Sequence, residues 1–187
     1  MNTPHHACAR RSPVRPPRGI TLVEAAVSVA IAAVVAGTML PSFEQVRERR
    51  HLEGIAAQLE TDIQWTRSLA VARSAVVRMS FLAEADAACY VVHTGAAGSC
   101  ACSGDGSATC EAGSEPLRSV RLGTEVPATL HSNVRSMAFD PVRGTVTPTA
   151  TIRVSGRGGG AIHQVVNIMG RVRSCSPGGA IVGYRAC

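Results

Sequence analysis

The segment RGITLVEAAVSVAIAAVVAGTMLPSF, from Arg18 to Phe43, decides the fold. Residues 20–40 are apolar or small at nearly every position. As a helix rising about 1.5 Å per residue, they are just long enough to cross the roughly 30 Å hydrocarbon core of a bilayer. Glu24 interrupts this pattern near its start, and a carboxylate at that depth is retained where a partner or a function requires it. The segment therefore predicts a membrane helix with one acid that needs a counter-charge.

A basic leader precedes the predicted helix. Residues 1–19 carry four Arg and no apolar run, and they end in Gly19. A secretory signal peptide has its apolar core before its cleavage site, so the order here is different. By the positive-inside rule the Arg-rich side lies in the cytoplasm. Residues 44–187 are then expected to form one domain outside the inner membrane, which is the periplasm of a Gram-negative cell.

Beyond Phe43 the pattern predicts a helix to about residue 75, followed by a sheet. Apolar or small side chains recur at spacings of three and four and form one stripe that must be buried. The stripe consists of Leu52, Ile55, Leu59, Ile63, Thr66 and Ala70. Short runs rich in Val, Ile and Thr follow, separated by Gly and Pro, and they predict antiparallel strands at 76–81, 89–94, 118–122, 134–139, 149–155 and 162–168. Residues 95–114 lack periodicity and are predicted to form a loop held by its own Cys residues. The fold class is α+β.

Basic charge is concentrated late in the chain. All 19 basic residues are Arg, and the formal net charge is +6. Residues 44–116 contain 6 Arg and 10 acids, a balance of −4, whereas residues 117–187 contain 9 Arg and 2 acids, a balance of +7. An Arg-only usage also arises from the codon bias of a GC-rich genome, but its position favours a surface that attracts polyanions.

The residues give no indication of an enzyme or a cofactor. His51, His93, His131 and His163 are scattered, and no GxSxG or HExxH motif occurs. The Gly-rich stretch 156–160 lacks the GK[ST] ending of a phosphate-binding loop and is predicted to be a turn.

Six of the seven Cys follow the predicted membrane helix, which suits disulfides in an oxidising compartment, with 15 possible pairings. The spacing of Cys100, Cys102 and Cys110 contains no CxxC pair, and His93 is the nearest His, so a metal site is not expected. A Cys175–Cys187 bond would close a small C-terminal loop, but Cys89 is an equally available partner.

A basic leader ending in Gly19, followed by ITLVE and an apolar run closing with LPSF, resembles the N-terminus of type IV pilins and type II secretion pseudopilins. The resemblance implies cleavage after Gly19 by a prepilin peptidase, methylation of the new N-terminus at Ile20, and retention of Glu24 for assembly. Most members have Phe where this chain has Ile20. The resemblance further implies a pilin-like fold, in which a long N-terminal helix with a membrane-spanning first half packs on an antiparallel sheet. The stretch LAVARSAVVR, residues 69–78, resembles the helix end of the FimT and GspH branch.

Glu24 gains a physical role from this resemblance. Cleavage would create a charged amine at Ile20, and a neighbouring subunit could then neutralise the buried carboxylate. The alternative is an anchor helix whose Glu24 lies at the membrane surface without a partner.

The C-terminal stretch Gly170-Arg171-Val172-Arg173 follows a strand-like run. On an extended chain Arg171 and Arg173 would point the same way, about 6 to 7 Å apart, which matches successive phosphates of a nucleic-acid strand. GRVR also resembles the GRxR motif through which FimT-type minor pilins contact DNA in natural transformation. The predicted basic surface is extended by Arg143, Arg153, Arg157 and Arg185.

The sequence therefore favours a minor pilin that binds double-stranded DNA for uptake and assembles with other pilins. Two alternatives remain open. One is a GspH-like minor pseudopilin of a type II secretion system, and the other is a structural initiator of pilus assembly without DNA binding.

Overall fold

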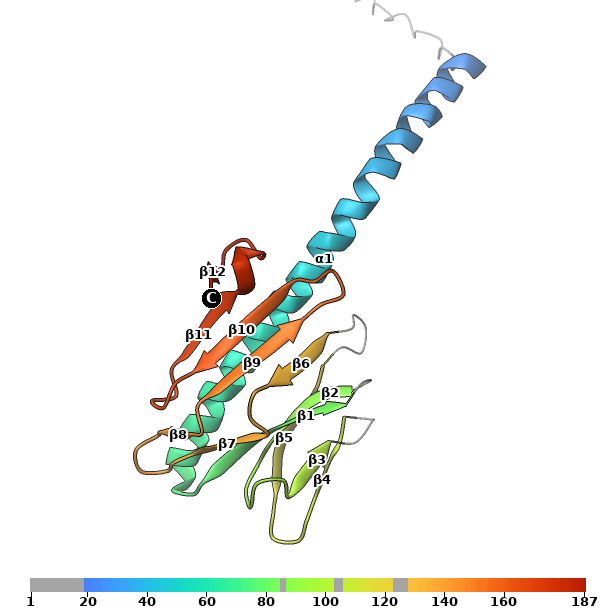
Figure 1. Cartoon of the computed structure of the whole chain (residues 1–187). Helices are drawn as coiled ribbons and strands as arrows, with labels where there is room; N and C mark the ends of the chain where they lie inside the picture. The colour runs from blue at the N-terminus through green and yellow to red at the C-terminus, as the bar shows by residue number, and fades with distance from the viewer. Residues whose placement is uncertain (1–18, 85–86, 103–105, 123–127) are drawn as a thin grey trace, which may run out of the picture. The chain divides into compact units, whose positions relative to one another are not determined.

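The computed structural model describes residues 19–84, 87–102, 106–122 and 128–187 (Figure 1). The predicted leader lies outside these residues except for Gly19, and the side chains of residues 38–42, 83, 84 and 87 lie outside them too. The chain divides into two units between Pro41 and Ser42. Helix α1, Leu22–Arg73, contributes its first part to one unit and the remainder to the other.

Thr21 marks the start of α1 in the first unit. Its Oγ1 accepts a hydrogen bond of 3.3 Å from the Glu24 amide, which is how Thr caps a helix. The apolar side chains that follow are exposed, including Leu22, Val23 and Val34. Within the residues that the structure describes, no helix is both long enough and apolar enough to cross a membrane.

The remainder of α1 supplies the predicted apolar stripe to the core of the second unit. All six stripe residues are buried, and Ala56 joins them. They pack in one cluster with side chains from the sheets, among them Met79, Phe139 and Ile152. This part of the prediction is confirmed, because a single apolar face at helical spacing has to be covered by other elements.

Two five-stranded sheets and a two-stranded sheet complete the second unit. We call the sheet with the order β5-β2-β1-β7-β8 the first sheet and the one with the order β12-β11-β10-β9-β6 the second sheet. Paired strands are antiparallel, except β11 and β12, which are parallel. The strands are β1 (Val77–Glu84), β2 (Ala87–His93), β3 (Cys100–Cys102), β4 (Ala108–Cys110), β5 (Pro116–Arg121), β6 (Thr129–Ser132), β7 (Ser136–Phe139), β8 (Val146–Thr147), β9 (Ala150–Ser155), β10 (Ala161–Val166), β11 (Val172–Ser176) and β12 (Arg185–Ala186), with a 3₁₀ helix η1 (Pro177–Gly179) before β12.

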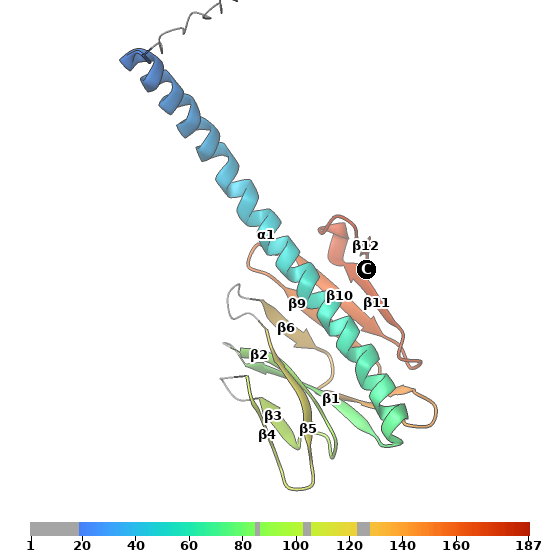
Figure 2. The same cartoon turned by 180° about the vertical axis from the view of Figure 1, so that it is seen from behind.

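Helix α1 covers one face of the second sheet and leaves the other face open (Figures 1 and 2). The covered face carries buried side chains at alternate positions, such as Ile152 and Val154 of β9. Gln164 of β10 also lies there, and its Nε2 donates a hydrogen bond of 3.0 Å to the carbonyl of Ala56 in the helix. The alternation fixes which side chains of each strand face solvent.

Several expected strand limits were wrong, and some strands were not expected. β10 ends at Val166 because residues 167–171 form a turn, and residues 95–114 contain the hairpin β3–β4 instead of a plain loop. Strands β6, β8 and β12 have four, two and two residues. Such short strands are stabilised by neighbours that are distant in sequence, so their own residues carry little periodicity.

Three disulfides join the six Cys of the second unit, pairing Cys89 with Cys102, Cys100 with Cys110, and Cys175 with Cys187. The Cys89–Cys102 bond joins β2 to β3, and the Cys100–Cys110 bond joins β3 to β4. The third joins β11 to the residue that follows β12.

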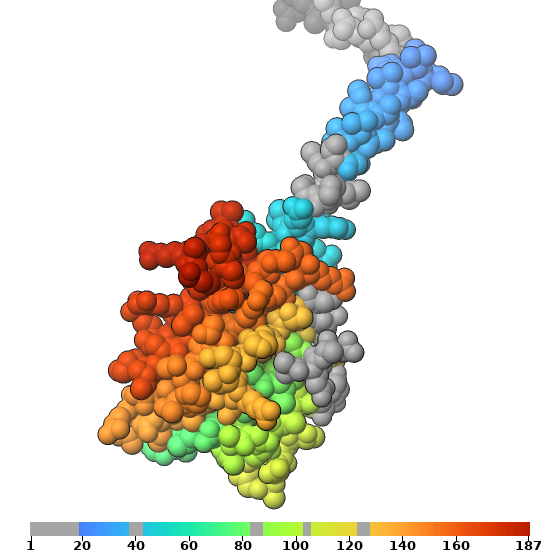
Figure 3. Space-filling model, in the orientation of Figure 1, coloured from blue at the N-terminus to red at the C-terminus, as the bar shows by residue number. Residues whose placement is uncertain are grey.

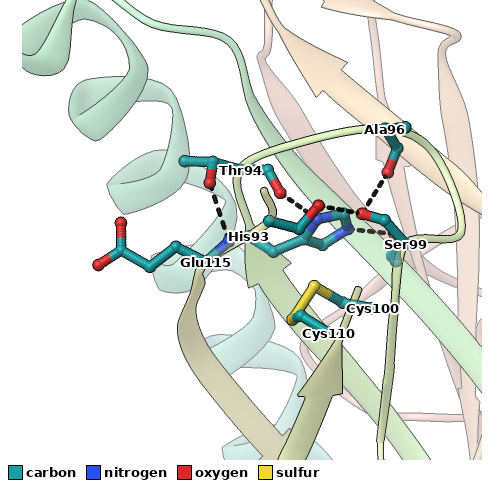
Figure 4. Close-up of a disulfide and its surroundings, with 9 residues drawn as sticks. His93, Thr94, Ala96, Ser99, Cys100, Cys110 and Glu115 are labelled. Atoms are coloured by element: carbon teal, nitrogen blue, oxygen red, sulfur yellow. Dashed lines mark hydrogen bonds between the residues drawn. A yellow bond between two sulfur atoms is a disulfide. The ribbon is translucent and has the colours of Figure 1, made fainter. Parts of the chain in front are cut away.

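The buried side chain of His93 lies beside the Cys100–Cys110 disulfide (Figure 4) and is paired with Ser80 of β1. The Thr94 carbonyl can only accept, so His93 Nδ1 carries the proton of their 2.9 Å hydrogen bond. Ser80 Oγ then donates to His93 Nε2 over 2.7 Å. Both side chains are buried, so the pair stabilises the junction of β1 and β2 and does not present a nucleophile to solvent.

A polar cluster on Asp62 connects the helix to the first sheet. Asp62 is 2% exposed, and its Oδ2 accepts a hydrogen bond of 2.6 Å from the Tyr90 hydroxyl of β2. Arg118 of β5 lies 3.1 Å from the same oxygen, with its guanidinium over the Trp65 ring. Burial and the Asp62 carboxylate raise the pKa of Tyr90 far above its usual range.

We expect Tyr90→Phe to lower the free energy of unfolding by about 1 to 3 kcal/mol, because the buried Asp62 oxygen loses one of its two donors and keeps only Arg118. The wild type should also lose stability as the pH rises past about 10, since only the unfolded state then releases the Tyr90 proton easily. The chain has no Lys, so its two Tyr, 90 and 184, dominate this range, and burial raises the pKa of Tyr184 as well. Urea unfolding at about pH 8 and about pH 11 checks both effects. An unchanged alkaline dependence in Tyr90→Phe would contradict the assignment, and Tyr184→Phe is the matched control.

Candidate nucleic-acid interface

The predicted GRVR motif lies at the tip of the β10–β11 hairpin. Gly170 and Arg171 belong to the turn, and β11 begins at Val172. The turn is closed by hydrogen bonds in which the Asn167 amide donates to the Arg171 carbonyl and the Arg171 amide donates to Asn167 Oδ1, at 3.1 and 2.9 Å. Arg171 and Arg173 are exposed, whereas Val172 between them is partly buried. Arg173 lies on β11, whereas Arg171 precedes the strand in the turn, so both charges are exposed at the tip but strand alternation fixes the direction of Arg173 alone.

Gly170 is needed for the shape of this tip. Its φ of 71° lies in the left-handed region, and a Cβ at this position would lie 3.0 Å from Cδ of Arg67. The Gly170 carbonyl accepts a hydrogen bond of 3.0 Å from Nε2 of Gln64. Helix α1 thus holds the hairpin tip in place through the hydrogen bond from Gln64, and the Arg67 side chain lies against Gly170.

The same arginine holds a second loop. Nε of Arg67 donates a hydrogen bond of 2.8 Å to the Gly144 carbonyl, in the turn between β7 and β8. Within this turn the Asp140 carboxylate accepts hydrogen bonds from the amides of Arg143 and Val142, which lower the pKa of Asp140. The Val146 amide then donates to the Ile168 carbonyl over 2.8 Å. The structure therefore places the Arg143 turn beside the GRVR tip.

The open face of the second sheet carries a row of basic and imidazole side chains. Strand pairing aligns Arg185 with Cys175, Cys175 with His163, His163 with Arg153, and Arg153 with His131. Arg173 lies on the same face, two residues from Cys175. We call the set Arg153, Arg173, Arg185, His131 and His163 the basic face. The strands of this sheet contain no Asp or Glu, and Figure 3 shows their surface as continuous.

The arginines and His163 of the basic face differ in charge near neutral pH. Among the described residues no ion pair involves any of its arginines, although Nε of Arg153 donates to Ser155 Oγ over 3.0 Å. Burial and the neighbouring Arg153 lower the pKa of His163, so its imidazole is neutral near pH 7. The arginines therefore supply the permanent positive charge of this face.

Arg157 lies away from the other predicted residues. It belongs to the Gly-rich turn between β9 and β10, at the opposite end of β10 from the GRVR tip. The amide of Gly158 in this turn donates to the Glu48 carboxylate over 2.7 Å. With β10 six residues long, the two turns are roughly 20 Å apart. The predicted basic surface is thus brought together without Arg157.

The predicted processing and assembly residues lie in the first unit. Gly19 and Ile20 are exposed and precede the helix, and Glu24 lies in its first turn. Besides its amide bond to Thr21, Glu24 contributes its carbonyl as acceptor for Ser28 Oγ, at 2.7 Å.

One group of potential metal ligands lies on the basic face. His163 and the sulfurs of Cys175 and Cys187 lie within 4.8 Å of one another. The two sulfurs are bonded to each other, so neither is a thiolate that could bind a cation.

Arg67→Ala should destabilise the second unit by about 1 to 2 kcal/mol, because both loops lose an anchor. The amides of residues 144 and 170 should also exchange faster with solvent. Denaturant unfolding and hydrogen exchange check this. The control is Arg73→Ala, which removes an exposed ion pair with Glu115 and should cost at most about 0.5 kcal/mol. Equal effects of the two changes would contradict an anchoring role for Arg67.

Comparison with known proteins gives a family and a fold. The family model described as type II transport protein GspH matches residues 56–170. Two crystal forms of the type IV minor pilin FimU from Pseudomonas aeruginosa have similar structures. One has a TM-score of 0.54 and 20% identity over 70% of this chain and 95% of FimU, and the other has a TM-score of 0.50 and 20% identity over 67% and 97%. No curated protein matches the chain.

Proposed function

Because this chain belongs to the GspH family of minor pilins and pseudopilins, we propose that it is a minor pilin of a type IV pilus that binds double-stranded DNA for uptake in natural transformation. DNA contacts the GRVR tip and the basic face. The observation that carries the proposal is the second sheet, whose open face gathers Arg153, Arg173 and Arg185 on strands that hold no acid.

Guanidinium groups suit this role because their paired donors fit phosphate oxygens. The tip is preorganised by Gln64 and Arg67, so little order has to be gained on binding. Aromatic platforms for stacking bases are scarce here, with Tyr184 partly buried. The expected binding is therefore directed at the backbone, independent of sequence and sensitive to salt.

The proposed processing follows from the N-terminal sequence. A prepilin peptidase cuts after Gly19, Ile20 becomes the methylated N-terminus, and residues 20–43 anchor the chain in the inner membrane with the second unit in the periplasm. Support comes from the apolar side chains of residues 22–35, which are exposed and need lipid or neighbouring subunits to cover them. After assembly, other pilins provide that cover.

A GspH-like pseudopilin of a type II secretion system is the second candidate. The observation that favours it is the description of the matching family model as a type II transport protein. In that case the basic face would bind an acidic surface of another pseudopilin. A structural initiator of pilus assembly would need neither a contact with DNA nor a contact between the basic face and an acidic pseudopilin surface.

Binding of a labelled DNA duplex by the full-length protein in non-ionic detergent tests the first candidate against the other two. We expect binding that weakens steeply with salt and does not depend on base sequence. The absence of binding at low salt would exclude the DNA-uptake function and leave the pseudopilin and initiator readings.

A further inference from the structure

Large apolar side chains are exposed at the GRVR tip. Ile168 is 58% exposed, Met169 is 56% exposed, and Val142 in the adjoining turn is 87% exposed. We call Ile168 and Met169 the apolar tip. In the second unit most side chains of this kind lie in the core, so their position in solvent requires a reason.

The backbone that carries the apolar tip is held firmly. The Ile168 carbonyl accepts from the Val146 amide, and the Gly170 amide donates to the Asn167 carbonyl over 2.9 Å. Gln64 binds the next carbonyl, that of Gly170. Both turns lie side by side at one end of the second unit (Figures 1 and 2). The two side chains are thus presented to solvent by a preorganised turn and not by a loose loop.

The surroundings of the apolar tip are cationic. Arg171 and Arg173 follow it in sequence, and Arg143 lies in the adjoining turn. Asp140, an acid of the adjoining turn, accepts hydrogen bonds from two amides of its own turn. A partner that fits this surface has a dense negative charge beside a narrow apolar or stackable surface. Duplex DNA has both, since base edges and sugars line the minor groove between two rows of phosphates.

We propose that Ile168 and Met169 form a wedge that enters the minor groove while Arg171 and Arg173 bind the flanking phosphates. This inference rests on the proposed DNA-binding function and adds a second kind of contact to it. Proteins that bind the minor groove use apolar wedges in this way, and partial unstacking bends the duplex. The wedge supplies affinity that does not depend on salt, whereas the phosphate contacts release counterions and do depend on it.

The two contributions can be separated with the full-length protein in detergent and a fluorescent duplex titrated at several NaCl concentrations. We expect Ile168→Ser/Met169→Ser to weaken binding roughly tenfold at every salt concentration and leave the salt slope unchanged. End-to-end energy transfer on a doubly labelled duplex should report bending by the wild type and less by this variant. Val182→Ser is the matched control, because Val182 is 72% exposed in the segment before β12, away from the tip.

Unchanged affinity of the double serine variant at all salt concentrations would overturn the wedge, even if Arg171→Ala/Arg173→Ala weakens binding. If neither variant changes the binding, DNA is bound away from the GRVR tip and the wedge is overturned, whereas the proposed function itself fails only if the wild type does not bind DNA at low salt. Normal DNA binding by the serine variant, combined with lost binding to anionic vesicles or to a partner pilin, would assign the apolar tip to that surface and overturn the wedge. Thermal unfolding verifies that the variants fold, and Met169→Ser alone serves as the test if the double variant does not.

Discussion

We expect Glu24→Ala to abolish incorporation of this protein into filaments, whereas the proposed processing and membrane insertion should be unaffected. The expected loss is about a hundredfold or more, because the amine at Ile20 of a neighbouring subunit keeps its charge in the apolar bundle without a counter-ion. Immunoblotting of sheared filaments and of the membrane fraction measures the two quantities separately.

Two controls make this prediction specific. The helix cap is formed by the backbone amide of Glu24 with Thr21 Oγ1, so an Ala at this position can still make it. Glu44→Ala removes an exposed acid from the second unit and should incorporate normally. Glu24→Gln removes only the charge and should behave like Glu24→Ala. Normal incorporation of either Glu24 variant would show that this carboxylate has no role in assembly.

The helix and the core strands could be predicted because their signals are local. Leu52, Leu59 and Ile63 repeat at the helical period, and all are buried. The strands around Met79 and Ile152 are rich in β-branched or large apolar residues between turn residues, and both residues are fully buried. Where an element is long enough for its period to repeat and packs one face against the core, its own sequence identifies it.

The arrangement of the candidate site could not be predicted, because it depends on pairing between distant residues. His131 and Arg153 are aligned by the pairing of β6 with β9, and nothing near either residue indicates the other. The anchoring role of Arg67 likewise has no signal in the sequence around it. Its role arises where two turns, around residues 144 and 170, meet the helix. A single sequence has no local pattern for such a contact.

Arg157 shows that the fold can also separate residues that the sequence groups together. By sequence it belongs with the other late arginines, yet β10 separates its turn from the GRVR tip. Net charge predicted a basic region, but only strand register decides which charges share a surface. Under the proposed function, a DNA strand that runs across the basic face would meet Arg153 and Arg185, whereas Arg157 belongs to the turn whose Gly156 and Gly158 lie against Glu48.

Arg171→Ala/Arg173→Ala should weaken duplex binding by about ten- to a hundredfold at low salt and reduce the slope of log K against log salt by roughly 1 for each lost phosphate contact. The effect should be equal for duplexes of different sequence, because phosphates carry no base information. Fluorescence anisotropy at several NaCl concentrations measures affinity and slope together.

A second double variant that removes the same charge elsewhere distinguishes a local contact at GRVR from attraction of DNA by the net charge of the protein. Arg47→Ala/Arg50→Ala also lowers the formal net charge from +6 to +4, since 6 − 2 = 4, but it changes exposed residues of α1 outside the basic face. This control should retain most of the affinity and the full slope. If both double variants lose the same affinity, binding reflects net charge, and GRVR is not the contact. If neither loses affinity, DNA is bound through other residues, and GRVR is not the contact.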